Sequence, residues 1–253
     1  MYPSWLDYVN EKRHKNLVNI LQELSKLQSQ ENLNFIIIGA LPLLIRDYLH
    51  YLVYWDVDLL FRDEETLREF IKMPKTRSLR IVNYDDNLMV NKNITSFHTA
   101  WSFNQTWFNV DYILKKAIFE FYTENISKLE PYIQKIKLNS EIYYIHLYIA
   151  HPWDVITEKV LSPRTEKDLS LKIDMSVDIR HIFAVYRKEK DNIQFWNHIL
   201  KRADFLQKRK KFTENFLSLL SHANELGYSD LEITPLSMEI LKTEYPNDTN
   251  ENE

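Results

Sequence analysis

Cysteine is absent from the 253 residues of the chain, and glycine occurs only twice, at Gly39 and Gly227. Without cysteine there can be no disulfide, no thiolate metal site and no cysteine nucleophile. Two glycines cannot build a Walker-type phosphate loop, and the Gly-x-Ser-x-Gly motif of serine hydrolases is missing. The eight histidines form neither His-x-x-x-His nor His-Glu-x-x-His, and only His151, which precedes a predicted helix, is a candidate for a substrate contact.

Long apolar runs are also missing. A membrane-spanning helix needs about 18 apolar residues, whereas IIIGALPLLI, 36–45, leads straight into Arg46 and Asp47. The first residues lack the basic and then apolar organisation of a signal peptide. A net charge of −4 argues against general attraction to nucleic acid or anionic membrane, although a local basic patch is compatible with it. We therefore expect a soluble, cytoplasmic protein.

The chain does have enough apolar residues, 45%, to bury a substantial core. We expect an α/β (α+β) protein with a small mixed sheet and flanking helices in 1–150, a helical domain in 151–245 and a polar tail in 246–253. The elements expected in the first 72 residues are a helix over 7–29, a strand over 35–38, a helix from Pro42 through LLIRDYLHYL, a strand over 53–61 and a helix over 63–72.

Further strands are expected over 78–82, 87–90, 96–101 and 107–114, while 141–150 fits either a strand or a short helix. From Pro152 onward the pattern is helical, and IQFWNHILKRADFLQKRKKF, 193–212, is part of it.

Two carboxylates stand out in YWDVDLLF, 54–61. Residues two apart on a strand point to the same face, so Asp56 and Asp58 share one face while Trp55 and Val57 pack into the core on the other. Like charges this close repel unless a cation lies between them, and Mg²⁺ suits oxygen ligands. In WFNVDYIL, Asp111 repeats the arrangement on a strand that could lie beside the first. Three such carboxylates can hold Mg²⁺ for displacement at phosphorus.

Gly39 ends an apolar strand and precedes the start of a helix. This arrangement lets a phosphate approach backbone N–H groups. The order strand, Gly, helix, Asp-x-Asp strand and later Asp strand is much more specific than any one of its parts.

With these motifs in IIIGA, DVDLLF and NVDYIL, the sequence resembles the nucleotidyltransferase superfamily of polymerase-beta-like fold. The segment HPWDVITEKVLSPRTEKDLSLKIDMSVDIRHIF, 151–183, is similar to the branch that includes the AbiEii-type toxins of toxin–antitoxin systems. The resemblance implies that a nucleoside monophosphate is transferred from an NTP such as ATP to a hydroxyl acceptor, with Asp56, Asp58 and Asp111 as metal-binding and catalytic residues.

The resemblance also implies nucleotide contacts at Gly39, Ala40 and Lys159, and a later acidic residue that is either Asp168 or Asp178. The usual residue after the glycine is Ser or Gly, so Ala40 lacks a hydroxyl donor to phosphate. The gap from Gly39 to Asp56 is also somewhat long for the pattern.

The acceptor implied by the resemblance is RNA, such as a tRNA end, or a protein, and a cognate antitoxin is a possible partner. The candidate RNA contacts lie in KRADFLQKRKKF, and they are Lys201, Arg202, Lys208, Arg209, Lys210 and Lys211. Two alternatives stay open. One is transfer to a small molecule such as an aminoglycoside, and the other is a regulatory nucleotide-binding module without chemistry.

Overall fold

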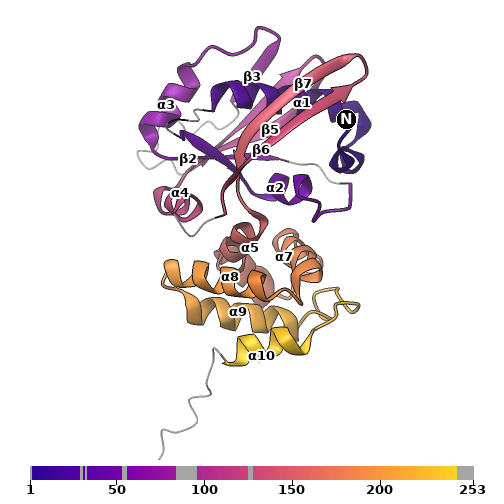
Figure 1. Cartoon of the computed structure of the whole chain (residues 1–253), viewed down its shortest axis with the longest axis vertical. Helices are drawn as coiled ribbons and strands as arrows, with labels where there is room; N and C mark the ends of the chain where they lie inside the picture. The colour runs from indigo at the N-terminus through magenta and orange to yellow at the C-terminus, as the bar shows by residue number, and fades with distance from the viewer. Residues whose placement is uncertain are drawn as a thin grey trace, which may run out of the picture. The chain divides into compact units, whose positions relative to one another are not determined.

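The computed structural model describes residues 2–28, 31, 33–52, 56–83, 96–124 and 128–243 (Figure 1). Trp55, the strand expected over 87–90 and the tail at 246–253 lie outside the described residues. The chain divides into two compact units, Met1–His151 and Pro152–Glu253. No helix of the described part is long and apolar enough to cross a membrane.

The first unit is built on a mixed sheet, in which the described residues form seven strands in the order β3-β4-β5-β2-β1-β7-β6. Two neighbouring pairs are parallel, β2 with β5 and β1 with β7, and the others are antiparallel. The strands are β1 (Phe35–Ile38), β2 (Val57–Phe61), β3 (Leu79–Asn83), β4 (Ser96–Phe103), β5 (Thr106–Leu114), β6 (Glu130–Leu138) and β7 (Glu141–Ile149). This mixed sheet confirms the α/β class expected from the sequence.

Helices lie on both faces of this sheet (Figure 1). They are the 3₁₀-helix η1 (Ser4–Tyr8), α1 (Glu11–Leu27), α2 (Ala40–Ile45), α3 (Glu64–Lys72) and α4 (Lys116–Thr123). Phe70 of α3 packs edge-on against Phe35, Phe61 and Tyr112, so these rings mark one face of the sheet. We call this the α1 face, because α1 lies on it together with α3, whereas α2 and α4 lie on the other face (Figure 1).

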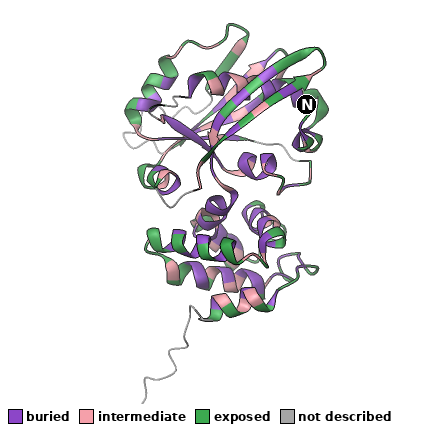
Figure 2. Ribbon diagram, in the orientation of Figure 1, coloured by how far each residue is buried: buried purple, intermediate pink, exposed green. Residues whose placement is uncertain are grey.

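Burial explains which strands are central. All four residues of β1 are buried, which fits a short apolar strand covered on both faces. In β4 and β5 buried residues alternate with more exposed ones, because only the α1 face is fully covered there. The same alternation runs along β6 and β7 (Figure 2).

The hairpin of β6 and β7 is tied to α1 by side chains. Ser25 accepts a hydrogen bond from the backbone N–H of His146 at 3.0 Å, and Gln28 accepts one from Tyr148 at 2.7 Å. The only Cα partners of β1 and β7 among the described residues are Ile37 and Ile149. Side chains of α1 therefore bond the backbone of β7 beyond the point where its pairing with β1 ends.

The second unit is helical within its described residues. It contains α5 (Pro152–Val160), α6 (Pro163–Ser170), α7 (Val177–Glu189), α8 (Ile193–Phe205), α9 (Arg209–Ser221) and α10 (Pro235–Thr243). Its core is aromatic: Trp196 packs edge-on against Tyr186 and Phe195, and it also contacts Phe216 with ring centroids 5.4 Å apart.

Several expected elements differ from the observed ones. The helix after Gly39 is wrong beyond Ile45, because Asp47 has a positive φ of 64° and the backbone N–H of Tyr48 bonds back to Leu43. The helical pattern over 193–212 is interrupted, since Gln207 has φ 55° between α8 and α9. The stretch 141–150 is a strand, β7, and neither α4 nor β6 was expected from the sequence.

Candidate functional site

Asp58 and Asp111 lie side by side on neighbouring parallel strands. Their Cα atoms are register partners in the pairing of β2 with β5. Paired residues of a sheet point to the same face, so the two carboxylates lie next to each other. Leu59 and Tyr112, the next pair, point to the α1 face, so the aspartates occupy the opposite face, which we call the carboxylate face.

Asp56 directly precedes β2 and is exposed. The loss of water around its carboxyl group and the nearby charge of Asp111 raise its pKa above the usual value. A hydrogen bond with Asn109 and the positive charge available on His98 and Arg13 act in the opposite direction. The acidic neighbour that acts on Asp56 is thus Asp111, and the repulsion expected between Asp56 and Asp58 stays a prediction.

His98 faces Asp111 from the other side. It is the Cα partner of Asp111 in the pairing of β4 with β5, and its Nδ1 lies 3.0 Å from Oδ2 of Asp111. The second oxygen, Oδ1 of Asp111, is buried and has no hydrogen-bond partner among the residues that the structure describes. Leaving a buried carboxylate oxygen unsatisfied is costly, so Asp111 has an oxygen to offer to a ligand.

The carboxylates of Asp58 and Asp111 are ligands of the kind that a hard cation prefers. A carboxylate pair with an unsatisfied oxygen matches the ligands that Mg²⁺ prefers. Within the described residues, no three His, Asp or Glu side chains are arranged to hold a single ion. A protein site for Mg²⁺ usually has one or two carboxylates, and substrate phosphates and water complete its shell. The metal-binding roles predicted for Asp56, Asp58 and Asp111 stay predictions.

Gly39 is required by its contact with Asp58. Its φ is 76°, and a Cβ atom added there would lie 2.0 Å from Oδ2 of Asp58. Any other residue would both strain the backbone and push the carboxylate aside. The helix that follows, α2, begins at Ala40 and has only six residues, so its dipole adds little. The phosphate contacts predicted for Gly39 and Ala40 stay predictions.

Lys159 and Asp178 both belong to the second unit and form an ion pair. Arg164 adds a second cation, with its Nε 3.7 Å from Oδ2 of Asp178. Burial acts to raise the pKa of Asp178, but Lys159 and Arg164 outweigh it and lower the pKa below the usual value. The other candidate, Asp168, accepts a hydrogen bond from Ser176 instead. The structure thus brings Lys159 together with Asp178 and not with Asp168.

The basic cluster expected at 201–212 is not one surface. Arg202 is fully buried, where its Nε donates to Oδ1 of Asp154 at 3.0 Å, so its prediction as an RNA contact is wrong. Arg209 pairs with Asp204 at 2.6 Å, and Lys211 pairs with Glu166 at 2.6 Å. The remaining members, Lys201, Lys208 and Lys210, are exposed and divided between α8, the turn and α9.

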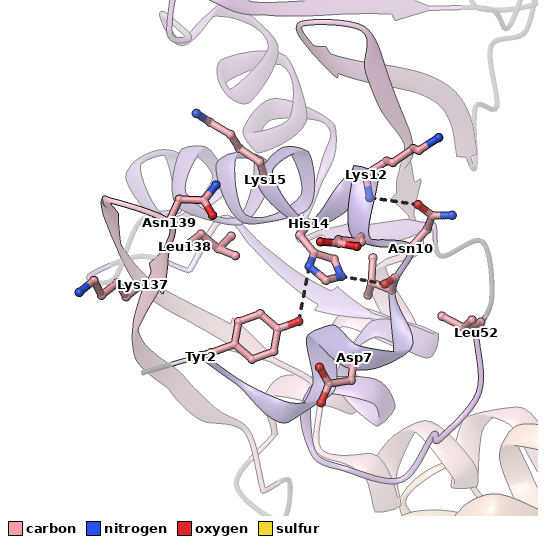
Figure 3. A pocket seen from close by; sticks show the side chains of 12 residues that line it. Tyr2, Asp7, Asn10, Lys12, His14, Lys15, Leu52, Lys137, Leu138 and Asn139 are labelled. Carbon is pink, nitrogen blue, oxygen red and sulfur yellow. Dashed lines mark hydrogen bonds between the residues drawn. The ribbon is translucent and has the colours of Figure 1, made fainter.

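A cavity of about 770 Å³ lies elsewhere on the first unit (Figure 3). It is formed by the N-terminal segment, the first turns of α1 and the turn between β6 and β7. Its lining mixes Asp7 and Glu11 with Lys12 and Lys137, and it contains none of the three predicted aspartates. His14 at its base is already bonded to the carbonyl oxygen of Val9 at 2.8 Å. The hydroxyl group of Tyr2 lies 3.5 Å from the other ring nitrogen, Nδ1, so both nitrogens of His14 are used in contacts within the protein.

The sequence reasoning missed two residues of the carboxylate face, His98 and Asn109. Alternation places His98 and Ala100 on one side of β4, and Asn109 and Asp111 on one side of β5. That signal was available, but the register that sets His98 opposite Asp111 depends on the turn between the two strands. His151, the other singled-out histidine, is the last residue before α5.

The fold and site together define an α/β protein with an acidic pair on one face of a mixed sheet. No family model and no curated protein sequence matches the chain. Among solved structures, it is similar to an antigenic nucleotidyltransferase-like protein from Paracoccidioides brasiliensis. The identity is 13%, the TM-score is 0.41, and the match covers 89% of this chain and 96% of that one. A likeness so distant carries no argument about activity, which must be argued from the side chains.

Proposed function

We propose that the protein is a metal-dependent nucleotidyltransferase, which transfers a nucleoside monophosphate from an NTP to a hydroxyl acceptor. The observation that carries the proposal is the register pairing of Asp58 with Asp111, together with the unsatisfied Oδ1 of Asp111. Two adjacent carboxylates beside the turn at Gly39 form a costly arrangement unless a cation and a phosphate use it. The family resemblance of the motifs around Gly39 points to the same chemistry.

The roles of the residues follow from their positions. Asp58 and Asp111 would hold Mg²⁺ together with Asp56, the third predicted ligand, and the ion when bound neutralises charge on the phosphate oxygens. Asp111 accepts the proton of the acceptor hydroxyl, and His98 orients that carboxylate from the neighbouring strand. The acceptor oxygen then forms a bond to the α-phosphorus, the bond from this phosphorus to the bridging oxygen breaks, and pyrophosphate leaves with the electron pair.

RNA, such as a tRNA end, is the acceptor that we propose. The action as a toxin restrained by an antitoxin, and the phosphate contact of Lys159, are further proposals that rest on the resemblance. Lys159 already has Asp178 as its partner, so a phosphate would have to compete with this carboxylate.

The test is incubation of the purified protein with each α-³²P-labelled NTP, Mg²⁺ and total tRNA. We expect label in RNA from at least one NTP, and a loss of at least about 100-fold in Asp58→Asn and Asp111→Asn. Asp191→Asn, an exposed carboxylate between α7 and α8, is the matched control and should retain the activity. Label transferred equally well by Asp58→Asn would overturn the assignment.

The same incubation separates the two alternatives. Label that appears only on an added aminoglycoside would identify a small-molecule transferase. If calorimetry finds that an NTP binds in the presence of Mg²⁺ but no acceptor takes up label, a regulatory nucleotide-binding module without chemistry would replace our proposal.

A further inference from the structure

The hairpin of β6 and β7 exposes one of its two faces. Side chains that point toward α1 are buried, as shown by Tyr143, Ile145 and Leu147. Those that point away are exposed even when they are apolar, since Ile133 is 69% exposed and Tyr144 is 62% exposed. We call the outward set the hairpin platform, and its residues are Pro131, Ile133, Lys135, Lys137, Ile142, Tyr144, His146 and Tyr148.

The platform belongs to the same face of the sheet as the predicted site. Ile38 is the register partner of Asp58, so Ile38 points to the carboxylate face and Ile37 to the α1 face. Ile37 is in turn the partner of Ile149, which places Ile149 on the α1 face. Because side chains alternate along β7, Tyr148 and the platform residues before it point to the carboxylate face.

The platform combines cations and rings and has no acidic residue, although the whole chain carries a net charge of −4. Lys135 places its Nζ 5.5 Å from the ring centroid of Tyr144. The rings of His146 and Tyr148 lie 6.2 Å apart and are tilted by 35°. The nearest glutamate of β7, Glu141, points to the α1 face and is bonded there by Lys15 at 2.7 Å.

We propose that the hairpin platform is a docking surface for single-stranded nucleic acid, the acceptor of the transfer reaction. Only the role of this nucleic acid as the acceptor rests on the proposed function, and its binding to the platform does not. Single strands are bound by rings that stack on bases and by cations that follow the phosphates. Tyr144, His146 and Tyr148 offer rings at alternate positions of one strand, and Lys135 and Lys137 offer the cations beside them on β6.

A second copy of the chain fits this surface less well. In a two-fold contact the same patch lies on both sides, so Lys135 and Lys137 would bring positive charge to both sides without an acidic residue of the platform to pair with. Lysines on an edge strand such as β6 also oppose edge-to-edge pairing. Single-stranded nucleic acid is the occupant whose charge and ring chemistry the platform complements.

The experiment measures binding without NTP or Mg²⁺, by fluorescence anisotropy of labelled single-stranded RNA and DNA of mixed sequence. Tyr144→Ala should weaken binding about 5- to 150-fold, the range for loss of one stacked base. The double variant Lys135→Gln with Lys137→Gln should weaken it and reduce the slope of log K against log salt by about 1.4. Lys72→Gln, an exposed lysine of α3 on the α1 face, is the charge control and should bind as the wild type does.

The outcomes separate this inference from the proposed function. If the wild type transfers nucleotide, the platform variants lose RNA binding, and Asp58→Asn binds RNA normally but transfers nothing, both proposals hold. If the wild type transfers no nucleotide yet loses binding only in the platform variants, the platform stands and the transferase falls. The platform proposal would be overturned if all platform variants bound RNA with wild-type affinity. It would also be overturned if sedimentation showed that these variants lose self-association instead of RNA binding.

Discussion

At the scale of single residues, the contact of Gly39 with Asp58 makes a prediction about both stability and metal binding. Gly39→Ala places a Cβ atom 2.0 Å from Oδ2 of Asp58 and strains a φ of 76°. We expect the free energy of unfolding to fall by at least about 1–3 kcal/mol. We also expect the thermal stabilisation by Mg²⁺ to be lost, since Asp58 must move. Differential scanning fluorimetry with and without Mg²⁺ measures both effects.

Gly227→Ala is the matched control for this experiment. Gly227 has φ 85°, and a Cβ atom there would lie 2.0 Å from Oδ1 of Asp174 in the second unit. Gly227→Ala should lower the free energy of unfolding by a similar amount but keep the thermal stabilisation by Mg²⁺. If Gly39→Ala responds to Mg²⁺ as the wild type does, Asp58 is not the ligand that we propose.

Sequence reasoning at this scale found which residues could share a face, but not which residues of different strands meet. The spacing of Asp56 and Asp58 and the repeat at Asp111 were visible in the chain, and the register pairing of Asp58 with Asp111 follows the expectation of neighbouring strands. His98 could not be assigned in the same way, because its partner is set by cross-strand register. The burial of Arg202 depends on tertiary packing and left no local signal.

At the scale of elements, a buried ion cluster joins α5 to α8. Oδ1 of Asp154 accepts from Nε2 of His198 at 2.6 Å and from Nε of Arg202 at 3.0 Å. Asp154 and Arg202 are both completely buried. Removal of Arg202 takes a positive charge away from the buried carboxylate of Asp154 and leaves it with His198, and breaking such a buried ion pair is strongly destabilising.

We therefore predict that Arg202→Ala lowers the free energy of unfolding by about 3–5 kcal/mol. Chemical denaturation followed by tryptophan fluorescence measures the change. The exposed neighbour Lys201→Ala should change stability by less than about 0.5 kcal/mol. An Arg202→Ala variant as stable as the wild type would show that the cluster does not hold α5 and α8 together.

Sequence patterns predicted strongly periodic elements well. They failed where apolar residues are buried from a loop or lie on the exposed face of a strand. The periodicity after Gly39 suggested a helix through Leu52, yet the helix ends at Ile45 and Leu49 is buried from a loop. The strand β6 was missed because apolar Tyr132, Ile133 and Ile136 break strict alternation, with Ile133 on the exposed face. The break between α8 and α9 was hidden because Gln207 is not a residue typical of positive φ.

At the scale of the whole molecule, His181 makes stability depend on pH. Burial, followed by the charge of Lys159, lowers the pKa of His181 to about 3 from its ordinary 6.5. The folded state thus binds this proton less tightly than the unfolded state does. The contribution of the neutral, buried His181 to the free energy of unfolding is complete above pH 6.5, and it is lost as the pH falls from 6.5 toward 3.

We predict that His181→Leu flattens the pH dependence of unfolding in this window by up to about 1.4 kcal/mol per pH unit. Denaturant titrations of the full chain at half-unit steps between pH 7.5 and 4.5 measure the slope. His50→Gln, an exposed histidine of the first unit, should keep the wild-type slope. An unchanged slope in His181→Leu would mean that folding does not lower the pKa of His181.

The placement of β1 between β2 and β7 has a consequence for how the chain folds as it leaves the ribosome. All three aspartates have been synthesised once Leu114 is added, and β2 and β5 can then pair. The other edge of β1 has no strand until Ile149 emerges, although β1 is wholly apolar. Throughout that interval a nascent chain presents an open hydrophobic edge, which is the form of intermediate that chaperones bind and that aggregates when translation stalls.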